Sequence, residues 1–268
     1  MTAPTGIVPG HARGVLLVVE HFWTWYRRNW RATAVSSILQ PLLFLLAFGV
    51  GFGSLVDGAG RAATGGVPYL VWLAPALLAV SAVQSAAFES TYPVLSAFKW
   101  QRVYHAMVAG PITPAQVALG HLAWTVAKIT GTGAVFVVVI AVFGGVAGPG
   151  IVGSLLAAAL TGAAVAALVM AFAATVENEG GPFNALFRFV VIPMTLFSGT
   201  FFPVDRLPEW VRPVAWISPL WHGTELARAA ALGTGRALAL LGHVAVLAGL
   251  LAVGIVLVTR LYRRRLTR

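Results

Sequence analysis

Four long stretches without a charged residue constrain the fold of this chain more than any other feature of its sequence. They cover residues 32–56, 67–88, 129–176 and 237–259. A helix that crosses about 30 Å of hydrocarbon needs about 20 apolar residues, and each stretch is long enough. Residues 129–176 are too many for one crossing, and the glycines and proline of residues 143–150 divide them into a helical hairpin. These stretches are therefore predicted to lie in a membrane.

Composition favours a membrane fold built from helices. Hydrophobic residues make up 59% of the chain and charged residues only 10%, whereas a soluble domain carries roughly 25% charged residues. The apolar stretches lack the period-two alternation that is typical of a membrane β-barrel. The chain contains no cysteine, which excludes disulfides and cysteine-based zinc or redox sites. We predict an all-α integral membrane protein.

We predict one transmembrane domain over residues 1–268 that crosses the membrane six times. Ahead of the first span, residues 15–31 place apolar and aromatic side chains at helical spacing opposite Glu20 and several arginines. This pattern predicts an interfacial elbow helix in the plane of the membrane surface, and a cytosolic extension of the first span is the alternative. The six spans are predicted at about residues 32–55, 68–87, 114–143, 151–176, 183–202 and 237–258.

Local signals mark the ends of several predicted helices. Thr113, Pro114 and Gln116 suit the N-cap, first and third positions of a helix, so the third span is predicted to begin in the cytosol. Between the fifth and sixth spans, Pro208 and Pro219 open two short helices that are too short and too polar to cross. We predict that these helices are amphipathic and re-enter the outer leaflet. Their tryptophans are Trp210, Trp216 and Trp221.

The formal net charge of +10 is distributed unevenly over this topology. With six spans and both termini on one side, that side collects eleven basic residues and the other side five. They are Arg13, Arg27, Arg28, Arg31, Lys99, Arg102, Arg260, Arg263, Arg264, Arg265 and Arg268, against Arg61, Arg206, Arg212, Arg228 and Arg236. Positive loops stay inside, so we predict cytoplasmic termini and a plasma (inner) membrane location. The basic excess is assigned to topology and anionic lipid rather than to nucleic acid.

The sequence provides no site for nucleotide hydrolysis or metal binding. A P-loop needs Gly-Lys followed by Ser or Thr, but the two lysines are followed by Trp100 and Ile129. The six histidines lie far apart without ligand spacing, and no nucleophile motif is present. The chain is therefore predicted not to be an enzyme and to hold no cofactor and no metal. Any ATP that drives its function is hydrolysed by another chain.

Two predicted spans carry polar residues at helical spacing on one face, and polar groups are costly in lipid. Such a face predicts the lining of a pathway or a seam between helices. Alternatively, Lys128 and Arg188 extend toward headgroups while the hydroxyls bond their own backbone. The centres of the spans hold no Asp or Glu, so the acidic relay typical of ion-coupled carriers is missing. The two faces are His121, Thr125, Lys128 and Thr132 in the third span and Asn184, Arg188, Thr195 and Ser198 in the fifth.

Three segments of the sequence resemble one family of transporters. The first is Phe48-Gly-Val-Gly-Phe-Gly53 at the end of the first span. The second runs from Glu89-Ser-Thr-Tyr92 through Tyr104-His-Ala-Met107 to Gly110-Pro-Ile-Thr-Pro114. The third and most specific is Pro193-Met-Thr-Leu-Phe-Ser-Gly-Thr-Phe-Phe-Pro203, followed by Leu207-Pro-Glu-Trp210 and Ser218-Pro-Leu220. Together they resemble the ABC-2 family of ABC-exporter permeases, in particular its nodulation-type lipo-oligosaccharide exporters and their antibiotic-resistance relatives.

The resemblance implies a permease subunit that works in an assembly. Two permease subunits, identical or homologous, pair across a central seam, and two separate ATPase subunits hold the ATP and Mg. Each ATPase docks on the loop between the second and third spans, where the resemblance places a coupling helix within residues 99–109. Glu89 and Glu177 are expected to pair with basic residues near a gate, and solvation alone is the alternative. The docking residues implied are Lys99, Arg102, Tyr104, His105, Ala106 and Met107.

The sequence therefore predicts the permease subunit of an ATP-driven exporter of amphipathic cargo, such as a lipid, a glycolipid or a hydrophobic drug. Few charges along the spans and the aromatic external helices favour such a cargo over a small ion. An ATP-independent membrane scaffold and a secondary carrier are the alternatives. The sequence leaves open which cargo is moved, in which direction, and whether the permease is a homodimer or a heterodimer.

Overall fold

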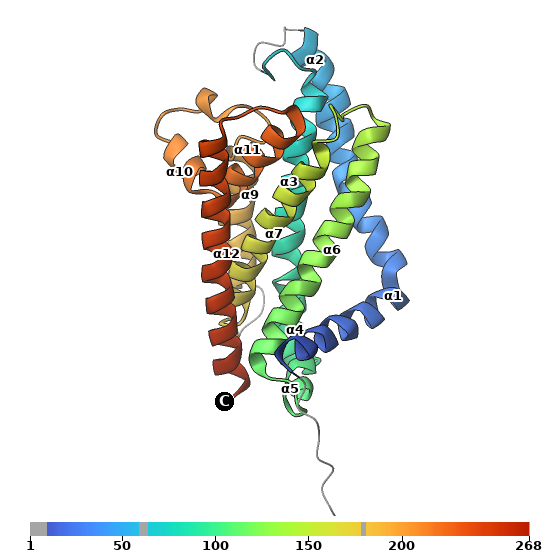
Figure 1. Cartoon of the computed structure of the whole chain (residues 1–268), viewed down its shortest axis with the longest axis vertical. Helices are drawn as coiled ribbons and strands as arrows, with labels where there is room; N and C mark the ends of the chain where they lie inside the picture. Colours follow the sequence, from blue (N-terminus) through green and yellow to red (C-terminus); the bar gives the residue numbers. More distant parts are fainter. Residues whose placement is uncertain (1–9, 59–63, 178–180, 268) are drawn as a thin grey trace, which may run out of the picture.

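The computed structural model describes residues 10–58, 64–177 and 181–267. Every regular element in these ranges is a helix, as the apolar stretches predict. The long helices stand side by side as an upright bundle (Figure 1). One end of the bundle, here called the α4–α5 end, carries α4 (Tyr92–Lys99) and α5 (Val103–Val108). The opposite α10–α11 end carries α10 (Arg212–Ile217) and α11 (Pro219–Leu232).

Four helical segments are long and apolar enough to cross a membrane, and they coincide with the second, third, fourth and sixth predicted spans. They are α3 (Tyr69–Glu89), which α4 continues, α6 (Pro114–Val142), α7 (Ile151–Ala173) and α12 (Ala237–Leu266). Two of them extend beyond their predicted bounds: α4 prolongs the second to Lys99, and α12 continues beyond residue 258 to Leu266. Arginines in its last turn favour this extension, since cations stabilise the C-terminal end of a helix.

The other two predicted spans are helical as well, and their crossing of a membrane stays a prediction. The first comprises part of α1 (His11–Phe44), the π-helix η1 (Leu45–Phe52) and α2 (Gly53–Gly58). The fifth is a shorter apolar stretch made of α8 (Gly181–Leu186), the π-helix η3 (Phe187–Val191) and α9 (Ile192–Phe197). The first predicted span is therefore helical throughout, whereas the fifth ends five residues before its predicted limit at residue 202.

The predicted elbow helix forms the first part of α1, which continues without a break into the first predicted span. Figure 1 shows the beginning of α1, here called the elbow segment (residues 11–30), crossing α6 before the helix turns and climbs the bundle. The crossing is close, because a Cβ on Gly120 would lie 2.5 Å from Cβ of Val18. The predicted start of α6 is confirmed as a capping box between Thr113 and Gln116, and Gln116 Nε2 also donates to the carbonyl of His11 at 3.4 Å. The same local motif thus begins α6 and holds the elbow segment.

Helix α7 lies at the centre of the bundle and packs against α3, α6, α11 and α12. Small residues allow these close approaches, as they do in lipid generally. A Cβ on Gly254 of α12 would lie 2.6 Å from Cβ of Ala167, and one on Gly223 of α11 would lie 2.3 Å from Oγ1 of Thr161. These two glycines therefore determine how closely α11 and α12 lie against α7.

The short helices differ from the sequence-based expectation. A helix is present within residues 99–109, as expected, but it is short: α4 ends at Lys99 and α5 covers only Val103–Val108. Arg102, between them, has φ 52°, which is unusual for a residue other than glycine. The helix opened by Pro208 begins later, at Arg212. Helix α11 packs against α3, α7 and α12, and most of its residues are buried within the bundle. Two of the predicted topology residues, Arg61 and Arg268, lie outside the described residues.

Candidate functional site

A cavity of about 820 Å³ lies between the elbow segment, α3, α6 and the residues around η3. Aromatic side chains of two helices form one wall, with Trp124 of α6 packed edge-on against Tyr26 of the elbow segment at 5.5 Å between ring centres. Phe187, Val191 and Ile192 also line the cavity, from η3 and the start of α9. The elbow segment therefore does not lie apart from the bundle but encloses space with it.

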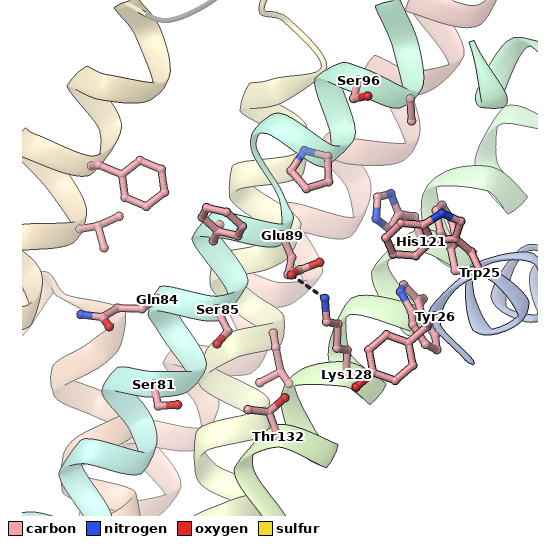
Figure 2. Close-up of a pocket in the computed structure, with 18 of the residues that line it drawn as sticks. Trp25, Tyr26, Ser81, Gln84, Ser85, Glu89, Ser96, His121, Lys128 and Thr132 are labelled. Atoms are coloured by element: carbon pink, nitrogen blue, oxygen red, sulfur yellow. Dashed lines mark hydrogen bonds and ion pairs between the residues drawn. The ribbon is translucent and has the colours of Figure 1, made fainter. Parts of the chain in front are cut away.

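An ion pair crosses this cavity from α3 to α6. Lys128 Nζ lies 2.7 Å from Glu89 Oε1, and Figure 2 shows the two side chains pointing toward one another. The Lys128 ammonium also lies 5.7 Å from the centre of the Tyr26 ring, within range of a cation–π interaction. Sequence analysis predicted Glu89 as a gate acid and Lys128 as a pathway residue, and the structure brings them together. Each neutralises the other, so the pair adds polarity to the cavity without net charge.

The lining of the cavity combines polar and apolar side chains. Ser81, Gln84 and Ser85 of α3, the helix that also carries Glu89, line the cavity (Figure 2). They recur at i, i+3 and i+4, which places them on one face of the helix. Sequence analysis missed them, although their spacing in an otherwise apolar stretch was the signal that would have identified them. The apolar part of the lining includes Phe44, Leu77, Val80, Ile129 and Phe136.

The predicted polar face of α6 lines the cavity for the most part. His121, Lys128 and Thr132 all line it. Thr125 does not, since its side chain is buried between helices and its hydroxyl has no hydrogen-bond partner among the described residues. Three of the four residues therefore share the environment that their spacing predicted.

The predicted polar face of the fifth span lies elsewhere. Asn184 and Arg188 do not line the cavity, and both side chains are exposed. Thr195 is buried and donates to the carbonyl of Val191 in its own helix at 2.9 Å, as the alternative reading of these hydroxyls expects. Ser198 is also buried, and its hydroxyl lies 2.6 Å from that of Ser218. The structure does not gather these four residues into one site.

The residues implied as docking contacts divide into two groups at the α4–α5 end. Lys99, Arg102, His105 and Ala106 are exposed and Met107 is half-buried. Tyr104 is fully buried and points into the bundle. Glu177 is exposed, and its backbone carbonyl accepts a hydrogen bond from Lys99 Nζ at 3.3 Å. A partner that docks at this end therefore contacts His105 and Ala106 directly. It affects Tyr104 only through the residues that cover it.

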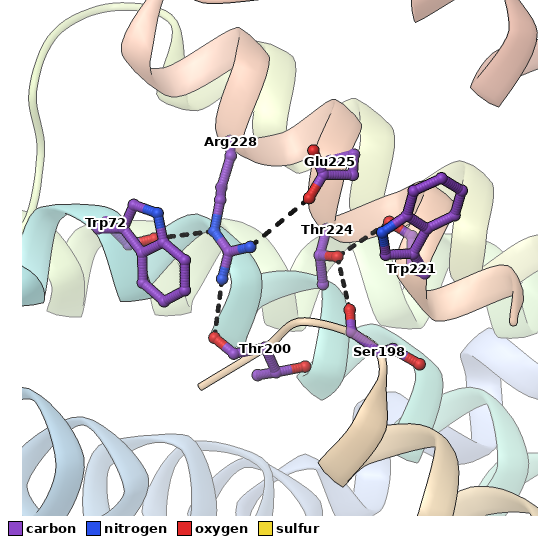
Figure 3. A network of polar contacts seen from close by, with 7 residues as sticks. All are labelled: Trp72, Ser198, Thr200, Trp221, Thr224, Glu225 and Arg228. Atoms are coloured by element: carbon purple, nitrogen blue, oxygen red, sulfur yellow. Dashed lines mark hydrogen bonds and ion pairs between the residues drawn. The ribbon is translucent and has the colours of Figure 1, made fainter. Parts of the chain in front are cut away.

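A buried arginine organises the α10–α11 end. Arg228 of α11 donates to the carbonyls of Trp72 at 3.2 Å and Thr200 at 2.8 Å, and its NH1 lies 3.8 Å from Glu225 Oε1 (Figure 3). Its guanidinium also stacks 3.5 Å from the centre of the Trp72 ring. Burial lowers the pKa of Arg228 to about 10, against the opposing effect of Glu225, so the group remains charged at neutral pH. Sequence analysis treated this residue only as an external topology charge.

The other predicted residues of this end are spread over its surface. Trp210 and Trp216 are exposed and Trp221 is half-buried. The structure brings two of the six histidines together, with Nδ1 of His222 2.8 Å from Nδ1 of His243. Among the residues that the structure describes, no group of three or more His, Cys, Asp or Glu side chains is placed to hold a metal ion.

Comparison with known proteins relates the chain to membrane transporters. Residues 14–232 match the family described as ABC-2 type transporter. Nodulation protein J of Rhizobium leguminosarum bv. viciae is 34% identical over 250 residues, which cover 91% of this chain and 94% of that protein. Nodulation protein J of Rhizobium meliloti (strain 1021) is 34% identical over 258 residues, with the same coverage of both chains. The corresponding protein of Bradyrhizobium diazoefficiens is 30% identical over 254 residues, covering 91% and 93%.

Proposed function

Because this chain belongs to the ABC-2 type transporter family, we propose that it is the permease subunit of an exporter that a separate ATPase drives. The family assignment makes it a multi-pass membrane component of a transporter. The proposal adds a second permease subunit, two ATPase subunits at the α4–α5 end, and export of an amphipathic cargo from the cytoplasm. It also assigns six spans and places both termini on the cytoplasmic side of the plasma membrane.

The observation that carries the cargo class is the mixed lining of the cavity, which combines apolar and polar side chains. A lipid, a glycolipid or a hydrophobic drug has an apolar part that suits Leu77, Val80 and Ile129, and a polar part that suits the serines, the glutamine and the ion pair of the lining. Binding pockets combine a mostly apolar lining with a few polar groups that fix orientation. The paired charges of Glu89 and Lys128 offer both a donor and an acceptor without attracting a small ion. The sequence resemblance to lipo-oligosaccharide exporters supports a lipid-linked saccharide within this class.

Purification in mild detergent, followed by mass spectrometry of proteins and bound lipids, tests the proposal. We expect an ATPase subunit to co-purify, and we expect vesicles that contain the complex to translocate NBD-labelled lipids only when ATP is present. A scaffold would function without the ATPase. A secondary carrier would stop when the proton gradient is dissipated and would ignore ATP. Either result would overturn the proposal.

Ala106→Arg tests the docking surface. Ala106 is exposed on α5, so the substitution leaves the packing of the chain intact but buries a cation in the proposed interface. We expect recovery of the ATPase in the purified complex to fall about tenfold or more, since burying an unpaired charge costs well over 1 kcal/mol. Thr267→Arg adds the same charge at the same end of the bundle, on the exposed end of α12, and should leave recovery unchanged. Equal recovery from both variants would contradict the assignment.

Lys128→Met tests the cavity. The change leaves Glu89 without its ion-pair partner in a half-buried site, and we expect translocation of the NBD-labelled lipid to fall roughly fivefold, equivalent to about 1 kcal/mol. The exchange Glu89→Lys with Lys128→Glu keeps a pair in place and should recover most of the rate. Glu209→Gln, on the exposed surface of the α10–α11 end, is the control for loss of one charge. If the exchange variant transports no better than the single variant, the pair is not part of the transport pathway.

A further inference from the structure

One hydroxyl group joins the short helix α5 to two of the long helices. The hydroxyl of Tyr104 on α5 hydrogen-bonds with Nδ1 of His121 on α6 and lies 3.3 Å from the hydroxyl of Tyr262 on α12. Tyr104 and Tyr262 are completely buried, and His121 is 3% exposed. The consecutive helices α5 and α6 therefore meet the distant helix α12 at a single polar group inside the α4–α5 end.

Aromatic packing surrounds this polar centre. Phe98 of α4 packs edge-on against the rings of both Tyr104 and Tyr262, at 4.7 and 4.8 Å between ring centres. The guanidinium of Arg265 lies 4.3 Å from the centre of the Phe98 ring and donates to the carbonyls of Ala173 and Ala174 at the end of α7. The cluster is therefore closely packed and reaches α7 as well.

The cluster also extends to the wall of the cavity, through His121 and the ring of Phe22. Phe22 of the elbow segment stacks on His121, with 4.4 Å between ring centres and 23° between planes. Both Phe22 and His121 line the cavity, whereas Tyr104 lies behind them. A path of three side chains thus leads from α5, whose outer surface exposes His105 and Ala106, to the wall of the cavity.

The polar groups of the cluster form one consistent order of hydrogen bonds. Burial, and secondarily the neighbouring Tyr262, raise the pKa of the Tyr104 phenol well above its usual value, so the hydroxyl keeps its proton. The Tyr262 hydroxyl can then donate to Tyr104, and the Tyr104 hydroxyl can donate to Nδ1 of His121. Apolar rings alone would fill the same space. A buried chain of polar groups whose hydrogen bonds are all satisfied also restricts its helices to one relative position.

We propose that Tyr104 is a positioning residue that transmits displacement of α5 to α6, to α12 and, through His121 and Phe22, to the elbow segment and the cavity wall. The inference rests on the proposed function, because it presupposes an ATPase that moves α5. In physical terms, the hydroxyl of Tyr104, rather than the bulk of its ring, keeps these helices in fixed relative positions during the movement.

Tyr104→Phe in the complete complex tests this role, because it keeps the ring packing and removes the hydroxyl. In vesicles, ATP hydrolysis and translocation of NBD-labelled phosphatidylethanolamine and NBD-labelled glucosylceramide are measured together. We expect hydrolysis within about twofold of the unsubstituted complex, and translocation per ATP lower by about tenfold, the loss expected for a buried hydrogen bond. Tyr262→Phe removes the second hydroxyl and should reduce the same ratio by a smaller factor.

Tyr92→Phe is the matched control, since Tyr92 lies on the neighbouring helix α4 and packs against Phe183 instead; its translocation per ATP should not change. An unchanged ratio in Tyr104→Phe would overturn the inference. A parallel loss of complex yield, thermal stability, hydrolysis and translocation would overturn it as well, because it would reveal a purely structural role. Absence of ATP-dependent translocation in the unsubstituted complex would instead refute the proposed function, on which the inference depends.

Discussion

Gly150→Ala is expected to lower the free energy of unfolding by about 3 kcal/mol, near the upper end for overpacked sites. A Cβ on Gly150 would lie 1.9 Å from the carbonyl oxygen of Ala230 and 2.9 Å from its carbonyl carbon. Both atoms belong to the backbone of α11, so no side-chain rotation relieves the overlap and α11 must move away from α7. The change is measured as a fall in the melting temperature in detergent, which we expect to be roughly 6–10 °C.

Gly148→Ala is the control for this experiment. Gly148 lies two residues earlier in the same loop, and a Cβ there would have no atom within 4 Å. Its melting temperature should stay within about 2 °C, the range of ordinary surface substitutions. If both variants melt alike, the close approach of α7 and α11 is not what this end of the fold depends on.

Arg228→Met is expected to destabilise the chain by about 2–4 kcal/mol. The substitution keeps most of the side-chain volume but leaves the carbonyls of Trp72 and Thr200 without their donor in a buried site. Hydrogen bonds to charged groups contribute about 1.5–3 kcal/mol each, and groups left unsatisfied add to the loss. The measurement is again the melting temperature in detergent, together with proteolysis of the segment that contains Thr200.

Arg236→Met controls for loss of one arginine at the same end. Arg236 is exposed just before α12, so we expect a change within about 0.5 kcal/mol, as for most surface positions. Equal stability of the two variants would mean that the buried network does not hold α11 against α3. Arg228→Lys should recover only part of the loss, because an ammonium cannot donate in the planar geometry of a guanidinium.

Features determined by neighbouring residues were predictable. Thr113, Pro114 and Gln116 predicted the start of α6, and the capping box that they form confirms it. The uncharged stretches predicted the helical class, and four of the six predicted spans are found as segments long and apolar enough to cross a membrane. Such predictions succeed because in lipid each helix must satisfy its own backbone hydrogen bonds, so the requirement is met within one continuous segment.

Contacts between residues far apart in the sequence were not predicted. At best, the individual residues that make them were singled out. Glu89 and Lys128 were both singled out, but nothing in their spacing of 39 residues indicated that they pair. Arg228 and Trp72 are 156 residues apart and contact each other only because α11 folds back onto α3. Tyr104 was implied as a docking contact and is instead buried, since its orientation depends on where α6 and α12 lie.

The sequence by itself determined the class of this protein: an all-helical membrane chain of the ABC-2 type, with its long helices and the beginning of α6 in place. Only the tertiary structure decided where the elbow segment encloses a cavity, which charges pair and which side chains face a partner. The physical reason is that hydrophobic length and helix capping are properties of consecutive residues. A cavity, an ion pair or a buried hydroxyl cluster depends instead on how closely helices approach, and here small residues such as Gly120, Gly150 and Gly254 determine that approach.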